Sequence, residues 1–175
     1  MTEAHVFIAQ SLDGFIATPT GGLEWLARVS RPGEDHGYAD FMARVDALLL
    51  GRATHDVVSA FPEWPYAGKR VYVATRRPRA TPNGEIVVAG SPDAILARLA
   101  ADGVRRVYID GGQLVSSFLA AGRVDELIVS VVPVLLGDGI PLFRATGERG
   151  LVLRGATTFA SGLVQLRYGL EAKAS

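Results

Sequence analysis

The sequence contains no cysteine in its 175 residues. This absence excludes disulfide bonds, thiolate zinc sites, cysteine-bound iron–sulfur clusters and catalysis by a cysteine nucleophile. An excess of charge is missing too, because 18 basic residues balance 18 acidic ones. The net charge therefore gives no overall electrostatic attraction to nucleic acid or an anionic membrane, and an anion site must come from a local cluster of basic or hydrogen-bonding groups.

Long apolar runs are also missing. No segment approaches the roughly 20 apolar residues that span a bilayer, and residues 1–10 lack the basic and apolar regions of a signal peptide. We therefore expect a cytoplasmic protein without a membrane segment. A chain of this length typically forms one domain with an adequate core, so residues 1–175 are predicted to be a single domain.

Several sequence motifs of known sites do not occur. The stretch "AGKRV" (67–71) lacks the upstream glycine of a phosphate-binding GxxxxGK[ST] loop. No GxGxxG follows a predicted strand, and no GxSxG elbow of an esterase is found. The three histidines have no metal or triad spacing, and basic residues are not interleaved with aromatic ones. We therefore expect no metal site and no nucleic-acid partner.

What is present is an alternation of apolar, β-rich runs with helical patterns. Strands are expected at residues 4–10, 47–50, 70–75, 85–90, 105–110 and 124–132. Helices are expected at residues 22–29, 38–45, 54–60, 92–102 and 113–121. Ser91 and Pro92 form an N-cap and a first helical position, and residues 151–160 and 163–172 read as a hairpin. This order predicts an α/β fold, with a mostly parallel sheet flanked by helices and an antiparallel hairpin at one edge.

Glycine, hydroxyl and arginine residues recur just after the predicted strands. The stretches are Ser11-Leu12-Asp13-Gly14, Gly51-Arg52-Ala53-Thr54, Thr75-Arg76-Arg77 and Asp110-Gly111-Gly112-Gln113. Open α/β sheets bind ligands at the carboxyl ends of their strands, so these stretches share one edge of the sheet. The set predicts a site for a long phosphorylated ligand that crosses several loops.

The stretch 51–54 opens a predicted helix, whose N-terminus offers free N–H groups and partial positive charge to a phosphate. Gly51 allows close approach of the backbone, Thr54 donates a hydroxyl and Arg52 supplies a charged fork. The alternative is a simple turn at Gly51 with Thr54 as a helix cap. Taken alone, the motif favours that alternative.

The cluster of Arg76, Arg77 and Arg79 lies beside a strand end, where it is suited to the 2′-phosphate that distinguishes NADP from NAD. A solvated loop is the alternative, and it is the more frequent meaning of a charge run. The pair Gly111-Gly112 permits close contact with a pyrophosphate or forms an ordinary turn. Asp13 is a candidate for proton transfer if burial raises its pKa, and a turn residue otherwise.

Five segments occur in an order that resembles the dihydrofolate reductase-like superfamily: "SLDGFIA" (11–17), "LLLGRATHDVV" (48–58), "VYVATRR" (71–77), "VYIDGGQLVSSFL" (107–119) and "VDELIVSVVPVLLGDGIPLF" (124–143). More closely, the chain resembles the reductase half of the bacterial bifunctional deaminase–reductase of riboflavin synthesis and its stand-alone relatives. The resemblance implies a dihydrofolate reductase-like three-layer sandwich, NADPH as hydride donor and frequent homodimers.

The resemblance also implies roles for residues. The turn that holds the cofactor phosphates corresponds to Gly51, Arg52 and Thr54. The strand end that receives the adenosine 2′-phosphate corresponds to Thr75, Arg76 and the adjacent Arg77. The glycine pair that carries a cis peptide beside the cofactor in dihydrofolate reductases corresponds to Gly111 and Gly112, with Gln113 next to it. Asp13 matches the acid of the turn near the nicotinamide and the substrate.

Two departures from the family pattern narrow the expected function. Dihydrofolate reductases place a tryptophan after the first strand and an acid on the first helix; here "SLDGFIA" replaces the tryptophan and only Glu24 stands in for the acid. Folate reduction is therefore not expected. The deaminase of the bifunctional enzyme binds zinc through cysteines, which this chain lacks. The candidate proton source is Asp13, or Glu24 acting through a water molecule.

The sequence thus predicts an NADPH-dependent reductase that transfers a hydride to a C=N or C=O of a small, heterocyclic substrate. One alternative is the riboflavin-pathway 5-amino-6-(5-phosphoribosylamino)uracil reductase without a deaminase domain, and another is a catalytically silent NADPH-binding module. A homodimer is possible through the apolar segments 127–132 and 134–143, although a buried core strand explains the same residues.

Overall fold

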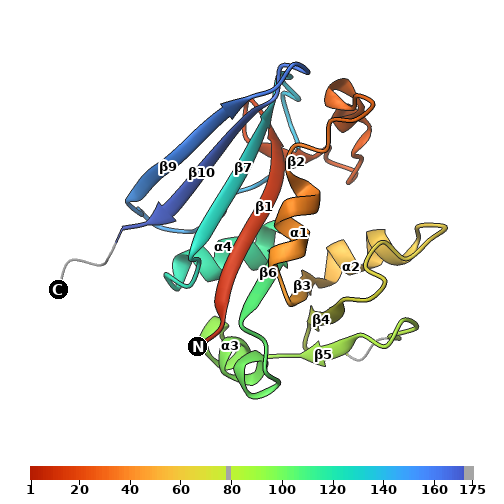
Figure 1. Cartoon of the computed structure of the whole chain (residues 1–175), viewed down its shortest axis with the longest axis vertical. Helices are drawn as coiled ribbons and strands as arrows, with labels where there is room; N and C mark the ends of the chain where they lie inside the picture. The colour runs from red at the N-terminus through yellow and green to blue at the C-terminus, as the bar shows by residue number, and fades with distance from the viewer. Residues whose placement is uncertain (78–79, 172–175) are drawn as a thin grey trace.

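The computed structural model describes residues 1–77 and 80–171, and an eight-stranded sheet forms their centre (Figure 1). The strand order is β5-β4-β3-β6-β1-β7-β10-β9. In chain order the strands are β1 (Glu3–Ser11), β3 (Ala47–Gly51), β4 (Arg70–Ala74), β5 (Ile86–Val88), β6 (Arg106–Asp110), β7 (Glu126–Val132), β9 (Leu151–Thr158) and β10 (Val164–Leu170). The pairs from β5 to β7 are parallel, whereas β10 is antiparallel to both β7 and β9. The mostly parallel sheet and the closing antiparallel hairpin are therefore confirmed.

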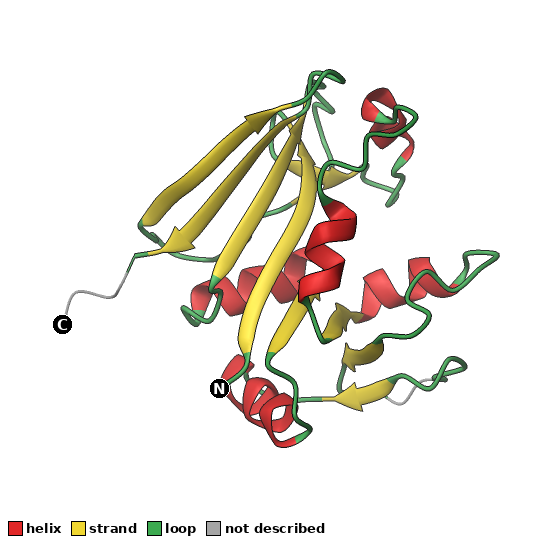
Figure 2. Ribbon diagram, viewed as in Figure 1, coloured by secondary structure: helices red, strands yellow, loops and turns green. Residues whose placement is uncertain are grey.

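Helices cover both faces of this sheet, which gives the predicted three layers (Figure 2). They are the 3-10 helix η1 (Glu24–Val29) and the α-helices α1 (Tyr38–Arg44), α2 (Arg52–Ser59), α3 (Pro92–Ala101) and α4 (Gly112–Ala120). Successive side chains of a strand point to opposite faces. Accordingly, Leu48 and Leu50 of β3 pack in one buried cluster with α1 and α2, while Ala47 and Leu49 pack in the other with α3 and α4.

The central strands are apolar because both of their faces are covered, and their register aligns the carboxyl ends. Leu50 of β3 lies opposite Asp110 of β6, and Gly51 lies opposite Ala74 of β4. The residues that follow these three strands therefore start from neighbouring points on one edge of the sheet. This alignment is what places the predicted ligand-binding stretches side by side.

Three local features differ from the predicted elements. The expected helix 22–29 is a six-residue 3-10 helix that begins at Glu24. A separate two-stranded sheet of β2 (Phe15–Ala17) and β8 (Ile140–Pro141) was not predicted, because strands of three and two residues leave no periodic pattern. The predicted end of the hairpin, Ala172, lies outside the described residues. The N-cap at Ser91 is confirmed, since its hydroxyl accepts a hydrogen bond from the Ala94 N–H at 3.3 Å.

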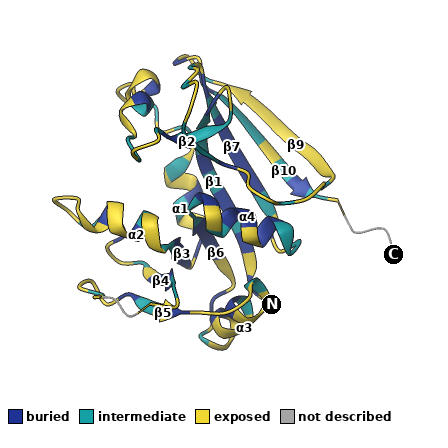
Figure 3. Cartoon of the chain, turned by 180° about the vertical axis from the view of Figure 1, so that it is seen from behind, coloured by how far each residue is buried: buried dark blue, intermediate teal, exposed yellow. Residues whose placement is uncertain are grey.

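Of the two segments suggested for a dimer, 127–132 belongs to strand β7, and 134–143 includes the exposed Leu135 and Phe143. Strand β7 lies between β1 and β10, and residues 127–130 are buried, so the core-strand interpretation of 127–132 is confirmed. Strand β9, in contrast, is the free edge of the sheet and is exposed at all eight positions (Figure 3). Within the residues described, no helix has the length and apolar character needed to cross a membrane.

Candidate functional site

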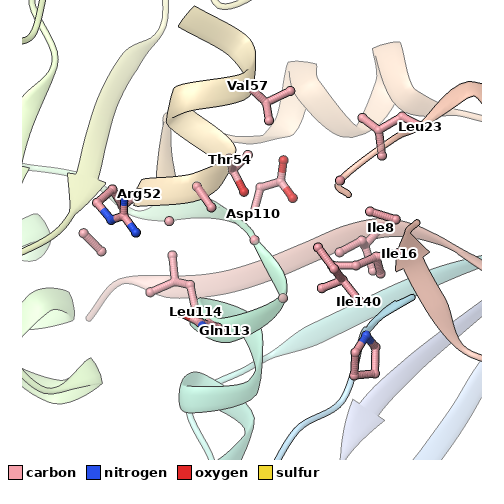
Figure 4. Close-up of a pocket in the computed structure, with 18 of the residues that line it drawn as sticks. Ile8, Ile16, Leu23, Arg52, Thr54, Val57, Asp110, Gln113, Leu114 and Ile140 are labelled. Atoms are coloured by element: carbon pink, nitrogen blue, oxygen red, sulfur yellow. The ribbon is translucent and has the colours of Figure 1, made fainter. Parts of the chain in front are cut away.

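A cavity of about 790 Å³ lies at the carboxyl ends of β3, β4 and β6 (Figure 4). Of the predicted cofactor residues, it is lined by Gly51, Arg52, Thr54, Thr75, Gly111, Gly112 and Gln113. Cavities of this size are typical of sites for small molecules and cofactors. The structure therefore brings together residues that lie up to 62 positions apart in the sequence, from Gly51 to Gln113, in one concave site.

The turn from β3 to α2 presents unpaired backbone donors to the cavity. Gly51 is the N-cap of α2, and no side chain caps the helix, so the interpretation of Thr54 as a helix cap is not supported. The first N–H groups of a helix have no intrahelical partner and carry partial positive charge. Arg52 follows at the first helical position, where its exposed guanidinium lies 3.4 Å from the Asp56 carboxylate.

A second uncapped helix begins at the same place. Gly111 is the N-cap of α4 with φ of +117°, which L side chains rarely adopt. A Cβ atom added to Gly111 would lie 2.8 Å from Thr54 Oγ1 and 3.5 Å from Gly51 Cα. The N-termini of α2 and α4 therefore meet at Gly111, where a larger side chain would be strained, and this arrangement, a candidate cradle, is suited to an anion.

The peptide geometry at this glycine pair corrects one implication of the resemblance. No cis peptide bond occurs within residues 1–77 and 80–171, so the cis peptide expected between Gly111 and Gly112 is absent. Gly112 is nevertheless tightly enclosed, because an added Cβ would lie 2.8 Å from Ile16 Cδ1 and 3.5 Å from the Pro141 carbonyl oxygen. The pair keeps the close packing that the sequence predicts.

The arginines after β4 lie at the margin of the cavity. Thr75 lines the cavity, and its Oγ1 accepts a hydrogen bond from the Arg77 N–H at 3.1 Å, which fixes the start of the turn. Arg76 and Arg77 are exposed and do not line the cavity itself. Arg79 lies outside the described residues. The suggested contact of Arg76 and Arg77 with a 2′-phosphate therefore stays a prediction.

The environment of Asp13 is not the one expected from the sequence. Its carboxylate is exposed and accepts hydrogen bonds from Ser11 Oγ at 2.6 Å and from the N–H groups of Leu136 and Gly137 at 3.1 and 2.7 Å. The Ser11 hydrogen bond, together with these N–H groups, lowers the pKa of Asp13. The expected rise of its pKa by burial is thus wrong, and Asp13 fixes the turn that follows β7.

Glu24 also lies apart from the cavity lining. It is exposed at the start of η1, and its carboxylate folds back towards Gly22, where an added Cβ would be 2.5 Å from Glu24 Oε2. Its suggested role as a proton source through a water molecule stays a prediction.

Asp110 is a titratable residue of the cavity that sequence reasoning did not propose as a catalytic group. It is the last residue of β6, it is partly buried, and its side chain lies in the cavity beside Thr54 (Figure 4). Burial raises the pKa of Asp110 to about 6, although the Gly111 N–H and the Tyr108 hydroxyl oppose part of the shift. A carboxyl group with such a pKa gains and releases a proton near neutral pH, as a general acid requires.

Three tyrosines interact electrostatically with Asp110. Tyr108 is buried next to it in the sheet and donates its hydroxyl to the Phe7 carbonyl oxygen at 2.9 Å. Burial, together with the Asp110 carboxylate, raises the pKa of Tyr38 to about 12 and raises the pKa of Tyr66 as well. No periodic pattern in the sequence connects these three tyrosines, and the only signal was the position of Asp110 at a strand end.

One buried histidine holds helix α2, which lines the cavity, against the rest of the protein. His55 of α2 is buried, and its Nε2 lies 2.7 Å from Glu85 Oε1, whose side chain is also buried. Glu85 in turn accepts a hydrogen bond from the Asn83 N–H at 2.9 Å. The pair ties α2 to the segment that enters β5. Across the part of the chain that the structure describes, no group of three or more His, Cys, Asp or Glu residues is arranged to hold a metal ion.

Comparison with known proteins agrees with this geometry. Residues 4–165 match the family of RibD C-terminal domains. The chain is 39% identical over 167 residues to the uncharacterized protein YwjB of Bacillus subtilis (strain 168), covering 93% of this chain and 95% of that protein. It is 32% identical over 162 residues to the riboflavin biosynthesis protein RibD of Corynebacterium ammoniagenes, covering 80% of this chain but only 46% of that protein.

Solved structures show the same fold. A protein assigned to riboflavin biosynthesis from Shewanella sp. PV-4 superposes with a TM-score of 0.90 at 36% identity, covering 98% of this chain and 100% of that one. The dihydrofolate reductase of Enterococcus faecalis, in complex with NADP(H), superposes with a TM-score of 0.62 at 18% identity, covering 97% of each chain. The fold is therefore dihydrofolate reductase-like, and the chain belongs to the RibD C-terminal domain family.

Proposed function

We propose that this protein is an NADPH-dependent reductase that transfers a hydride to a C=N or C=O group of a small, heterocyclic substrate. The observation that carries the proposal is the meeting of two uncapped helix N-termini, α2 and α4, at Gly51 and Gly111 beside Arg52. Two adjacent sets of free N–H groups and a guanidinium suit a pyrophosphate. Family membership supports an oxidoreductase, because relatives carry reductase names.

The residues on either side of these helix N-termini are suited to the ribose phosphate and the nicotinamide of a dinucleotide. Thr75 follows the neighbouring strand β4, and the exposed Arg76 and Arg77 come next at the margin of the cavity. On the other side of the cradle the lining becomes apolar, through Ile8 and Ile16. The N-termini of α2 and α4 would hold the phosphates, Arg76 and Arg77 would hold the 2′-phosphate, and the apolar side of the cavity would receive the nicotinamide.

The bound NADPH supplies the hydride, and the protein must supply the proton. Asp110 is suited to this role because its carboxyl lies in the cavity and its pKa is raised to about 6. The neutral carboxyl holds a proton that can be donated to a nitrogen or oxygen of the substrate. Of the two acids predicted from the sequence, neither Asp13 nor Glu24 lines the cavity, so Asp110 replaces them in this proposal.

Calorimetric titration of NADPH tests the phosphate cradle. Arg52→Ala removes a charge-assisted hydrogen bond worth about 1.5–3 kcal/mol, so the dissociation constant is expected to rise by roughly 10- to 100-fold. Arg98→Ala is the matched control, because Arg98 is an exposed arginine of α3 that forms the same kind of i,i+4 pair, with Asp102, outside the cavity. Equal affinities of wild type and Arg52→Ala would contradict the proposal.

A second candidate function is supported by the names of relatives. A bifunctional enzyme of Thermotoga maritima that includes a 5-amino-6-(5-phosphoribosylamino)uracil reductase shares the fold, with a TM-score of 0.73 at 16% identity over 97% of this chain and 57% of that one. Steady-state oxidation of NADPH in the presence of that uracil derivative tests this candidate. Absence of turnover with it, alongside tight NADPH binding, would exclude the riboflavin-pathway substrate.

Two further expectations belong to the proposal. If none of a panel of heterocycles oxidises bound NADPH, a catalytically silent binding module is favoured.

The homodimer that the resemblance implies is expected to use the exposed edge strand β9, where Leu151, Val152 and Leu153 are solvent-exposed. Analytical ultracentrifugation of the wild type and of Leu153→Arg checks this expectation.

A further inference from the structure

The cavity contains a second arginine besides Arg52. Among the described residues, its basic lining consists of Arg52 and Arg144. The Arg52 guanidinium lies 3.4 Å from the Asp56 carboxylate. Arg144 is exposed, and its guanidinium forms no hydrogen bond or ion pair with residues 1–77 and 80–171. The Arg144 side chain is therefore available to an anionic ligand in the cavity.

The backbone of Arg144 is fixed against helix α4. Ser116 is buried in this helix, and its Oγ accepts a hydrogen bond from the Arg144 N–H at 3.0 Å and donates one to the Leu142 carbonyl oxygen at 3.2 Å. The next residue, Ala145, has φ of +50°, in the left-handed region that residues with a side chain rarely adopt. Such a conformation persists where the surrounding structure fixes it. The Arg144 side chain therefore starts from a fixed position beside α4.

This position is about one helical turn from the N-terminus of α4. Ser116 follows Gly112, the first residue of α4, by four positions, which is about 6 Å along the helix axis. Residues four apart lie on the same face of a helix. The segment before Arg144 runs along this face, because a Cβ added to Gly112 would lie 3.5 Å from the Pro141 carbonyl oxygen. The long side chain of an arginine spans one turn, so the guanidinium can reach a group bound at the start of α4.

The start of α4 lies between α2 and β8 (Figure 4). On one side, Gly111 packs against the N-cap of α2, the helix that begins with Arg52. On the other side, Gly112 packs against Pro141 of β8, three residues before Arg144. The two arginines therefore approach the start of α4 from different sides.

From these observations we infer that Arg144 is a phosphate-binding residue of this cavity, which meets a phosphate at the start of α4 from the side opposite to Arg52. The inference rests on the proposed function, which assigns Arg52 and the helix N-termini to the cofactor phosphates. A guanidinium donates paired, charge-assisted hydrogen bonds to a phosphate. The phosphate has two sources: the pyrophosphate of NADPH, or a phosphate ester of the substrate bound beside it.

Calorimetric titration of Arg144→Gln tests the inference, because this substitution removes the charge and keeps a polar side chain. If the phosphate belongs to the cofactor, the dissociation constant of NADPH is expected to rise by about tenfold. If it belongs to the substrate, the affinity for 5-amino-6-(5-phosphoribosylamino)uracil at saturating NADP⁺ is expected to fall about tenfold, while that for the same nucleoside without its phosphate stays unchanged. Unchanged affinities for both NADPH and the phosphate ester overturn the inference.

Two further variants separate the charge of Arg144 from a structural effect. Arg144→Lys keeps the positive charge and is expected to recover part of the affinity that Arg144→Gln loses, since lysine also binds phosphate. Arg105→Gln is the matched control, because the Arg105 side chain is 88% exposed and lies before β6, at the opposite edge of the sheet from the cavity. An equal loss in Arg105→Gln, or no recovery in Arg144→Lys, contradicts the inference.

The two proposals fail in different ways. If NADPH binds and Arg52→Ala weakens its binding, but Arg144→Gln changes the affinity for neither NADPH nor the phosphate ester, the inference is wrong and the reductase function stands. If the wild type binds the ester but no NADPH, and Arg144→Gln weakens the ester, the reductase function is wrong and Arg144 is still a phosphate-binding residue. If the wild type binds neither ligand, both proposals are wrong.

Discussion

Replacing Asp110 with asparagine removes a carboxyl group whose raised pKa makes the stability of the protein depend on pH. The folded-state pKa is about 6, against an ordinary value of 3.8. The folded state therefore binds a proton more tightly than the unfolded state between these two values. The stabilisation is fully present below pH 4 and is lost as the pH rises through 6.

The size of this effect follows from the shift. A rise of about 2 pKa units at about 1.4 kcal/mol per unit gives roughly 3 kcal/mol between pH 4 and pH 7. Asparagine has no proton to lose, so the wild type is expected to lose roughly 3 kcal/mol relative to Asp110→Asn over this range. Other carboxylates titrate in both proteins, and their contributions cancel in the difference.

Urea unfolding of both proteins at several pH values between 4 and 8 measures the difference, with tryptophan fluorescence as the signal. The sequence has two tryptophans, and Trp25 is buried. A parallel kinetic measurement links the titration to function, because Asp110→Asn is expected to lose turnover while it retains NADPH binding. A difference in stability that is independent of pH would refute the assignment of Asp110 as a buried titrating group.

Other substitutions probe the remaining features of the site. Gly111→Ala forces a residue with a side chain into a positive φ and places its Cβ 2.8 Å from Thr54 Oγ1. The substitution is expected to lower the free energy of unfolding by about 1–3 kcal/mol, measured by urea unfolding, and to weaken NADPH binding, measured by calorimetry. His55→Ala leaves the buried Glu85 with only its Asn83 hydrogen bonds and is expected to cost about 3–5 kcal/mol in the same unfolding assay, whereas an unchanged midpoint would show that the pair contributes nothing. Asp13→Ala removes the acceptor for the Leu136 and Gly137 N–H groups, so the melting temperature of this variant is expected to fall while its turnover number is retained. Loss of turnover without loss of stability would restore Asp13 as a catalytic acid.

The parts of the site that the sequence predicted are those with local signals. Gly51, Arg52 and Thr54 follow a short apolar strand, and the parallel register then brings them beside Gly111 and Gly112. The end of a strand can be recognised from its neighbours in the chain, and the parallel sheet follows from the order of the elements. This is why seven of the nine predicted cofactor residues line one cavity.

The parts that the sequence missed depend on contacts between distant residues. The raised pKa of Asp110 comes from its burial in the folded chain, and Tyr38 and Tyr66, which interact electrostatically with it, come from other parts of the sequence. The lowered pKa of Asp13 comes first from the hydrogen bond of Ser11, two residues away, and then from N–H groups more than 120 residues away. Neither environment has a periodic pattern, so sequence reasoning identified two exposed acids and passed over the partly buried Asp110.

The central claim is that the strand ends bind NADPH, and differential thermal stabilisation tests it most directly. A ligand that binds only the folded state raises its stability, by about 2.7 kcal/mol at 100 times its dissociation constant. NADPH is expected to raise the melting temperature clearly more than NADH at equal concentration, and Arg76→Ala or Arg77→Ala is expected to abolish that preference. If neither nucleotide shifts the melting temperature, the claim is wrong.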